Sequence, residues 1–110
     1  MIYSQGDIVE VDFDPTRGHE PASRRPALVV SSYDFNISNS MTIVCPITTR
    51  MRPFFLHQEL PQDCCVRGSV VMEQVRALDL DARPTRLLGS LPKNELDPIL
   101  TCIRSFFDAD

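Results

Sequence analysis

A polar loop near the start of the sequence combines groups that can act on a phosphate. Arg25 stands directly before Pro26, and His19 and Glu20 precede it by a few residues. The residue before a proline is restricted to extended backbone conformations, so the Arg25 side chain is expected to project from a rigid backbone position. A guanidinium can hold a phosphate through two N–H groups and stabilise charge developing on it, while Glu20 and His19 can move protons. The alternative is a solvated loop with one Glu–Arg ion pair.

A second polar point follows the apolar run 41–47. Thr48 and Thr49 come at its end, where a sheet presents side chains to a cleft. Threonine hydroxyls can position a phosphate oxygen. Threonine is also a good strand residue, so these two residues alone also fit an ordinary strand.

A third polar point interrupts the apolar stretch that begins at Val70. Strand alternation places Glu73 on one face, and Gln74 and Arg76 on the other. A carboxylate or amide on a mostly apolar strand is either a surface position or a site group. Both interpretations stay open from the sequence alone.

The charge distribution predicts a local basic groove on an acidic protein. The net charge of −4 argues against a non-specific duplex DNA binder, which needs broad phosphate neutralisation. Cationic side chains nevertheless gather in or near the three polar segments: Arg17, Arg24, Arg25, Arg50, Arg52 and Arg76. Arg50 and Arg52 also precede Phe54 and Phe55, a combination that suits unstacked bases, although either phenylalanine can instead be strand core. The alternative is a set of charges scattered over a solvated surface.

Short strands followed by one helix must position these groups. Alternation and apolar runs predict strands over residues 7–13, 27–30, 41–47, 54–59, 66–77 (with a break near Glu73) and 86–90. Residues 31–40 are expected to be a polar loop. Apolar residues at helical spacing from Leu96 to Phe107 predict an amphipathic helix. Because Pro98 cannot lie deep inside a regular helix, this helix is expected to start near Asn94 or at an Asp97 cap, or to be kinked there. The fold class is therefore α+β, on a curled sheet or barrel of short antiparallel strands with a C-terminal helix.

Size and composition favour a single domain, residues 1–110. The four cysteines lack the paired spacing of metal sites and are interpreted as small hydrophobic residues, and the two histidines form no metal pair. No apolar run approaches the ~18 residues of a membrane span, and the N-terminus lacks the pattern of a secretory signal. We therefore expect a cytoplasmic protein with reduced thiols, no metal and no membrane contact.

Taken in their order and at their spacing, several segments of this sequence resemble the MazF/PemK/Kid toxins of bacterial toxin–antitoxin systems. The resemblance extends from Gly6 to Phe107. It is carried by Gly6-Asp7-Ile8-Val9-Glu10-Val11-Asp12-Phe13-Asp14-Pro15-Thr16, by Gly18-His19-Glu20 followed by Arg25-Pro26-Ala27-Leu28-Val29-Val30, by Pro46-Ile47-Thr48, and by Gln74-Val75-Arg76 with Leu78-Asp79.

The resemblance implies a fold, an activity and partners. Such toxins are SH3-like, CcdB-type barrels with a C-terminal helix, and they form homodimers. They are sequence-specific endoribonucleases that cut single-stranded RNA, usually messenger RNA, at short sequence motifs without metal or cofactor. The RNA's own 2′-hydroxyl attacks, leaving a 2′,3′-cyclic phosphate and a 5′-hydroxyl. A cognate MazE-like antitoxin neutralises the toxin by laying an acidic, disordered segment over the RNA groove.

The resemblance also implies residue roles. Arg25 matches the catalytic arginine and Thr48 the threonine that holds the scissile phosphate. Glu20 matches a carboxylate proposed as the base, and His19 the histidine of the Kid-like Gly-His-Glu loop. Glu73 falls where Kid has its proposed catalytic aspartate, but Val71 stands in place of Kid's catalytic arginine.

The general base therefore stays open between Glu20 and Glu73. The remaining candidates are expected to contact RNA. They are Gln74, Arg76, Arg17, Arg24, Arg50 and Arg52. The competing hypothesis is a non-catalytic, CcdB-type toxin that binds a topoisomerase. We expect a dimer interface that includes residues 41–46 and part of the C-terminal helix.

Overall fold

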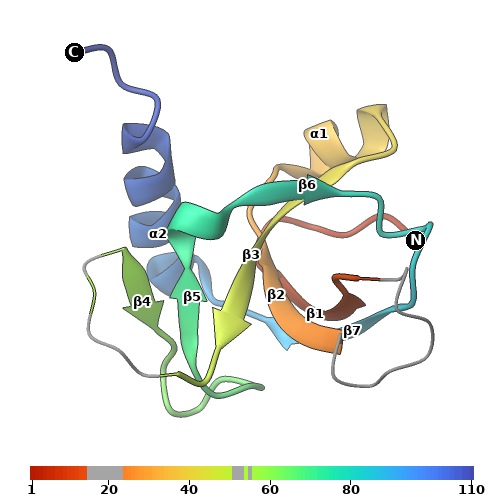
Figure 1. Cartoon of the computed structure of the whole chain (residues 1–110), viewed down its shortest axis with the longest axis horizontal. Coiled ribbons are helices and arrows are strands. Elements are labelled where there is room, and N and C mark those ends of the chain that lie inside the picture. The colour runs from red at the N-terminus through yellow and green to blue at the C-terminus, as the bar shows by residue number, and fades with distance from the viewer. Residues whose placement is uncertain (15–23, 51–53, 55) are drawn as a thin grey trace.

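An antiparallel sheet curls around its own core, with a long helix packed against one side (Figure 1). The computed structural model describes residues 1–14, 24–50, 54 and 56–110. The elements are β1 (Asp7–Asp12), β2 (Arg24–Val29), α1 (Tyr33–Ser38), β3 (Thr42–Thr48), β4 (His57–Glu59), β5 (Ser69–Val71), the 3₁₀ helix η3 (Met72–Gln74), β6 (Arg76–Leu78), β7 (Thr85–Ser90) and α2 (Lys93–Ser105). The predicted α+β fold class is confirmed.

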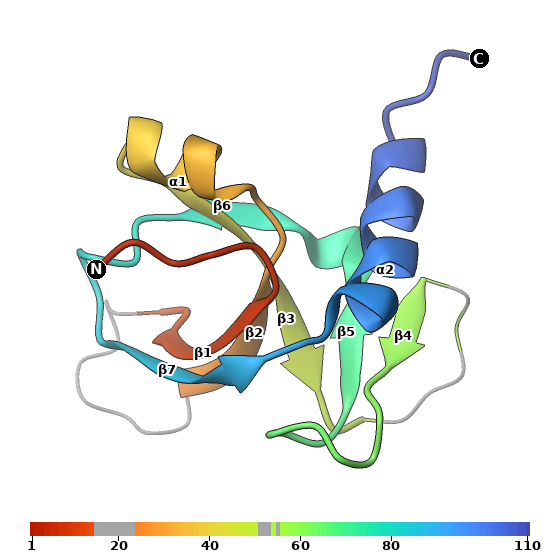
Figure 2. The ribbon, with the colours of Figure 1, turned by 180° about the vertical axis from the view of Figure 1, so that it is seen from behind.

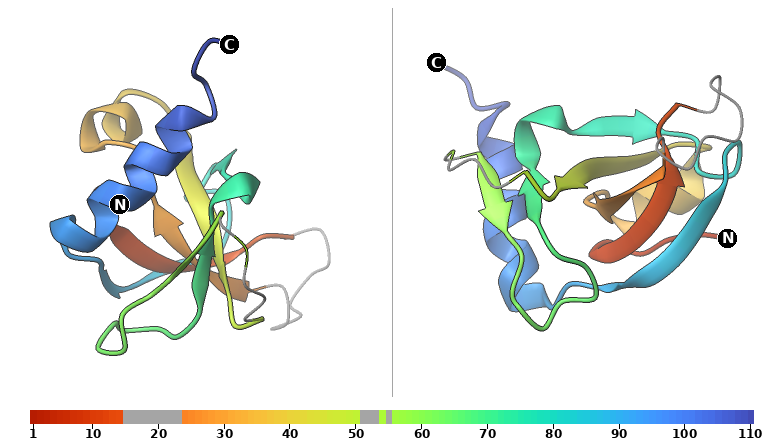
Figure 3. Two further views of the ribbon diagram at one scale, coloured as in Figure 1. Left: turned by 90° about the vertical axis from the view of Figure 1, so that its left-hand side faces the viewer. Right: turned by 60° about the horizontal axis from the view of Figure 1, so that its bottom comes forward.

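Strand β3 is the hub of the seven-stranded sheet. The strand order is β4-β5-β3-β2-β1-β7, and β6 pairs with β3 off this path. The first half of β3 pairs with β6, its middle with β2 and its end with β5. The sheet is curled as a result, as Figure 3 shows from two directions.

The two faces of the sheet build two hydrophobic cores. One core contains Ile8, Leu28, Cys45, Ile47 and Val70, and α2 covers it with Leu96, Ile99 and Leu100 (Figure 2). The other contains Tyr3, Val9, Val11, Ala27, Val29, Val44, Leu78 and Leu80. Ala27, Leu28 and Val29 are fully buried, which confirms the prediction of a strand buried on both faces.

The prediction of a polar loop over residues 31–40 was wrong. Helix α1 lies there, with Ser32 as its N-cap, whose Oγ accepts a hydrogen bond from the Phe35 N–H at 3.1 Å. Asn36 is buried and donates through Nδ2 to the Tyr3 carbonyl at 2.9 Å. Asn36 also bonds Ser31, so a small set of buried polar contacts holds the short helix in place, which hydrophobic periodicity cannot reveal.

The predicted break near Glu73 is confirmed, because η3 separates β5 from β6. Strand β4 begins only at His57, later than the predicted Phe54. Helix α2 begins at Lys93, and Pro98 lies inside it. No helix in the described ranges is long and apolar enough to cross a membrane.

Candidate functional site

Arg25 and Thr48 lie on one face of the sheet, where β2 and β3 separate. Arg25 stands opposite Val11, and Ala27 stands opposite both Val9 and Pro46. Directly opposed residues share a face, and so do residues two apart on a strand, so Arg25 and Thr48 share this one. It is termed the site face below.

The pairing of β2 with β3 ends at Ala27 and Pro46, leaving Arg25 and Thr48 on the two prongs of a fork. Pro26 follows Arg25 and has no backbone N–H, which weakens the ladder at this point. Arg25 is exposed and Thr48 is half-buried. The fork therefore offers a guanidinium and a hydroxyl together, as a phosphate site requires.

The Thr48 side chain is held in place by the backbone around it. Its Oγ1 accepts a hydrogen bond from the Arg50 backbone N–H at 3.1 Å, so its own O–H is left to donate to a ligand. Gly68 lies against the other side of the residue. A Cβ at Gly68 would lie 2.3 Å from the Thr48 carbonyl oxygen, so only glycine fits there.

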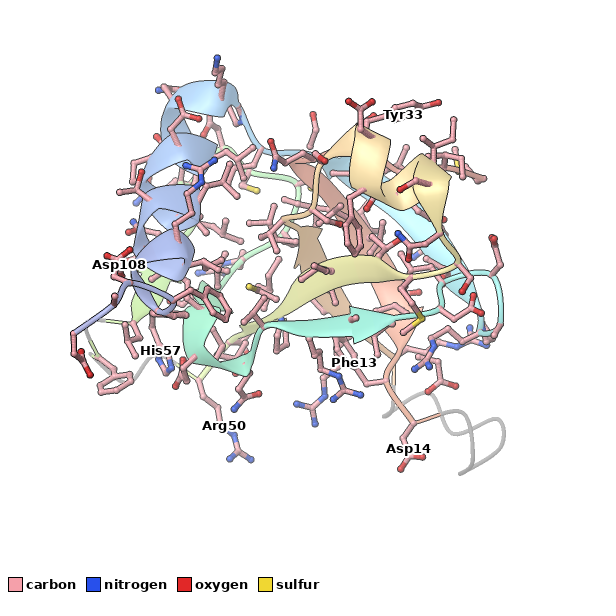
Figure 4. The ribbon with its side chains drawn as sticks, turned by 90° about the horizontal axis from the view of Figure 1, so that it is seen from above. Phe13, Asp14, Tyr33, Arg50, His57 and Asp108 are labelled. Atoms are coloured by element: carbon pink, nitrogen blue, oxygen red, sulfur yellow. The ribbon has the colours of Figure 1, made fainter. Side chains whose placement is uncertain are left out.

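Arg76 is on the same face, because it stands opposite Val44, two residues before Pro46. Its guanidinium carbon lies 5.2 Å from the centroid of the Phe13 ring. This cation–π contact restricts an otherwise flexible side chain while leaving its N–H groups free for a phosphate. Figure 4 shows Phe13, Arg50 and His57 projecting from one side of the molecule, opposite Tyr33.

Glu73 is paired with a histidine that the sequence analysis did not select. Nε2 of His57 lies 3.1 Å from Oε2 of Glu73, with side chains 18% and 34% exposed respectively. The Phe54 ring packs edge-on against the imidazole, with centroids 5.1 Å apart. Nδ1 of His57 is buried without a hydrogen-bond partner in the described residues. The contact with His57 therefore fixes the orientation of the Glu73 carboxylate.

His57 also belongs to the site face, because it stands opposite Val71 in the β4–β5 pair. The sequence did offer a signal for His57. His57 and Glu59 lie two residues apart on one short strand, so their side chains are on the same face. Pairing with Glu73 crosses 16 residues of chain, and no local pattern predicts such a contact.

Other predicted residues are exposed or fall outside the described ranges. Gln74 in η3 is exposed, and so are Arg24, Arg25, Arg50 and Arg76. Arg17, His19, Glu20 and Arg52 lie outside the described residues. The structure therefore brings one part of the predicted set together, comprising Arg25, Thr48 and Arg76 on one face, with Glu73 beside its histidine.

The cysteines take no part in this arrangement. Burial, and next the charge of Glu73, raise the pKa of the Cys45 thiol from 9.0 to about 12, so it stays protonated at neutral pH. All four cysteines are free thiols. Within residues 1–14, 24–50, 54 and 56–110, no three His, Cys, Asp or Glu side chains gather as a metal site would require.

Comparison with known proteins agrees with this arrangement of strands. Residues 4–107 match the family model described as the PemK-like, MazF-like toxin of type II toxin–antitoxin systems. The endoribonuclease toxin ChpB of Escherichia coli K12 is 42% identical over 96 residues, covering 79% of this chain and 78% of that protein. The endoribonuclease toxin MazF of the same organism is 31% identical over 103 residues, covering 89% and 87%.

Solved structures give the same result. The MazE–MazF complex (Form-II) of Deinococcus radiodurans aligns with a TM-score of 0.84 at 25% identity, covering 100% of this chain and 99% of that one. MazF (Form-I) from the same organism aligns with a TM-score of 0.83 at 30% identity, covering 96% of each chain.

Proposed function

Since the chain belongs to the PemK-like, MazF-like toxin family of type II toxin–antitoxin systems, we propose that it is a metal-independent endoribonuclease that cuts single-stranded RNA. One observation carries the proposal. Arg25 and Thr48 stand on the two prongs of the fork between β2 and β3, on one face of the sheet. The relatives that bear the name endoribonuclease include ChpB, MazF and PemK of Escherichia coli.

In the proposed reaction the 2′-oxygen of the RNA bonds to the adjacent phosphorus, and the bond from phosphorus to the 5′-oxygen breaks. The 2′-proton passes to a carboxylate, and the leaving 5′-oxygen takes up a proton, for which Arg25 is our candidate donor. The products are a 2′,3′-cyclic phosphate and a 5′-hydroxyl. Attack is intramolecular, so positioning supplies much of the acceleration. DNA lacks the nucleophile and is not a substrate.

Each residue on the site face has a role in this step. The Arg25 guanidinium stabilises the charge on the phosphorane, which can contribute on the order of 10²–10³-fold to the rate. The Thr48 hydroxyl donates to a phosphate oxygen, and Arg76 holds a neighbouring phosphate. Glu73, oriented by His57, and Glu20 are the two candidate bases, either of which would add about 10²–10⁴-fold. The exposed Gln74 and Arg50 line the RNA path in this proposal, and Arg17, His19 and Arg52 are further candidates for contact with RNA. Arg24, also expected to contact RNA, stands opposite Asp12 and therefore lies on the other face of the sheet from Arg25.

We also propose two protein partners. The first is a cognate MazE-like antitoxin whose acidic segment covers the arginines of the site face; the solved MazE–MazF complexes support this assignment. The second is another copy of the chain. An apolar hollow of about 370 Å³ between α2 and the β3–β6 edge, lined in part by Ile43, Val75, Ala77, Ile103 and Phe107, supports the expected interface. We assign the activity to the cytoplasm, where messenger RNA is translated.

The test is incubation of the purified protein with several long single-stranded RNAs in EDTA, with the product ends analysed. We expect cyclic phosphate and 5′-hydroxyl ends, and a loss of about 10²-fold or more in rate for Arg25→Ala. Arg86→Ala is the matched control, because Arg86 is an exposed arginine paired with Glu10 at 3.4 Å. If no RNA is cut, the proposal fails, and binding to a topoisomerase becomes the leading hypothesis.

A further inference from the structure

A row of opposed residues extends the site face beyond Thr48. Thr48 stands opposite Ser69 on β5, and Ser69 stands opposite Glu59 on β4. Opposed residues share a face, so the Glu59 side chain leaves the sheet on the same side as Thr48. Neighbouring strands lie about 4.8 Å apart, which places the Glu59 backbone about 10 Å from that of Thr48.

The Glu59 carboxylate is exposed and unpaired. Its side chain forms no hydrogen bond or ion pair within the described part of the chain, and only its backbone carbonyl accepts a bond, from Gln58 Nε2 at 3.5 Å. The Glu73 carboxylate, by contrast, is already engaged by His57, whose Nε2 lies 3.1 Å from its Oε2. As far as the described residues go, both oxygens of Glu59 are available to accept hydrogen bonds.

A hollow of about 510 Å³ adjoins this row, which is within the size range of small-ligand sites. Its walls include Glu59, Gln62 and Arg67, and also Gly68, the glycine that packs on the Thr48 carbonyl. The hollow is also lined by Thr49, the residue after Thr48, so it adjoins the end of β3 and carries one negative and one positive side chain.

A carboxylate in an RNA path cannot bind the backbone, because phosphate and carboxylate repel each other. It can accept hydrogen bonds from the amino group of a base, as carboxylates do from cytosine N4. On the same edge uracil places a carbonyl oxygen on each side of its single N3–H, and the lone pairs of these oxygens repel the carboxylate, so uracil is a poorer partner than a base with an exocyclic amino group. An unpaired glutamate in this position therefore selects among bases.

We propose that Glu59 is a specificity-determining residue, which admits a base bearing an exocyclic amino group next to the cut and disfavours uracil there. Arg67, on the wall of the same hollow, would hold the phosphate of that nucleotide. The inference rests on the proposed ribonuclease function. It adds a base preference at one position of the RNA, and it names the residue that sets this preference.

The experiment maps cut sites in a pool of random-sequence RNA for the wild type and for Glu59→Gln. We expect the wild type to select against uracil at one fixed position. Glu59→Gln, whose amide also donates, should relax that preference about 5- to 100-fold without changing preferences elsewhere. Asp97→Asn in α2 is the matched control for loss of one exposed negative charge, and it should keep the wild-type profile.

A second measurement does not depend on cleavage. Oligonucleotides with a 2′-deoxy sugar at the cut site cannot react, and their affinities for both proteins should show the same change in base preference. If Glu59→Gln raises affinity or rate for every sequence alike, as Asp97→Asn would by charge alone, Glu59 only repels RNA and the inference is wrong. If the wild type binds selectively but cuts nothing, the proposed nuclease function fails instead.

Discussion

Nε2 of His57, on β4, lies 3.1 Å from Oε2 of Glu73 in η3, which ties two sides of the site face together. Neither side chain is fully buried, so the pair is screened by solvent. We expect a double-mutant cycle with His57→Ala and Glu73→Gln, followed by urea unfolding, to give a coupling of about 0.5–1 kcal/mol. A coupling near zero would mean that the contact does not fix the carboxylate.

The same variants distinguish a base from a positioning residue. If Glu73 is the base, Glu73→Gln should lower kcat by about 10²-fold or more. His57→Ala, which only releases the carboxylate, should lower kcat less and leave KM nearly unchanged. Equal, small effects from both variants would move the role of base to Glu20.

Gly68 should be among the least replaceable residues. Its φ of +127° and the 2.3 Å approach to the Thr48 carbonyl make Gly68→Ala strained and crowded against backbone. We expect a loss of about 2–4 kcal/mol in the free energy of unfolding, together with lost cleavage. Gly89→Ala is the comparison: its Cβ would meet the movable Cys65 Sγ at 2.7 Å, so the loss should be smaller.

Phe13 should influence RNA binding although it is not charged. Phe13→Leu removes the ring under Arg76 and should weaken RNA affinity by about 0.5–1 kcal/mol without changing the number of phosphates contacted. Arg76→Ala should weaken affinity and also reduce the slope of log affinity against log salt by about 0.7. Fluorescence titrations at four salt concentrations separate the two effects. An unchanged slope for Arg76→Ala would remove Arg76 from the RNA path.

The buried Cys45 thiol predicts a loss of stability at alkaline pH. Its pKa is raised in the folded protein to about 12, so between pH 9 and 12 the unfolded chain has lost a proton that the folded chain keeps. Stability contributed by this group is therefore lost as pH rises through that window, by up to about 1.4 kcal/mol per pH unit. Urea unfolding from pH 8 to 10.5 should show a flatter profile for Cys45→Ala than for the wild type.

Phe107 and Ile103 line the hollow beside α2, and Phe107 is 79% exposed. We expect Ile103→Asp to convert the proposed dimer to a monomer of 12.4 kDa in sedimentation at micromolar concentration. Asn94→Asp at the exposed start of α2 introduces the same single negative charge and should leave the dimer intact. A wild-type protein that sediments as a monomer would contradict the interface.

The sequence predicted the residues that burial and strand pairing constrain, and missed those held by polar contacts between distant parts of the chain. The strand through Ala27 and Leu28 could be read from its continuous apolar run, because both faces of it are buried. Helix α1 depends on buried Asn36 bonding to Tyr3, a contact across 33 residues that no periodicity encodes. Of the candidate site, Arg25, Thr48 and Arg76 were predicted and share one face, whereas His57 and Glu59 became visible only through the strand register.

Strand β3 carries Ile43, on the wall of the hollow beside α2, and Thr48, at the fork. Between these two residues, substitutions of side chains are tolerated but a change in the number of residues is not. One residue inserted or deleted there would exchange the two faces for everything that follows, turning Ile47 to solvent and Thr48 into the core. The segment 61–67 belongs to no strand, so a change in its length exchanges no faces. Variation among relatives in what they cut should therefore accumulate there, while the residues from Ile43 to Thr48 keep a fixed count.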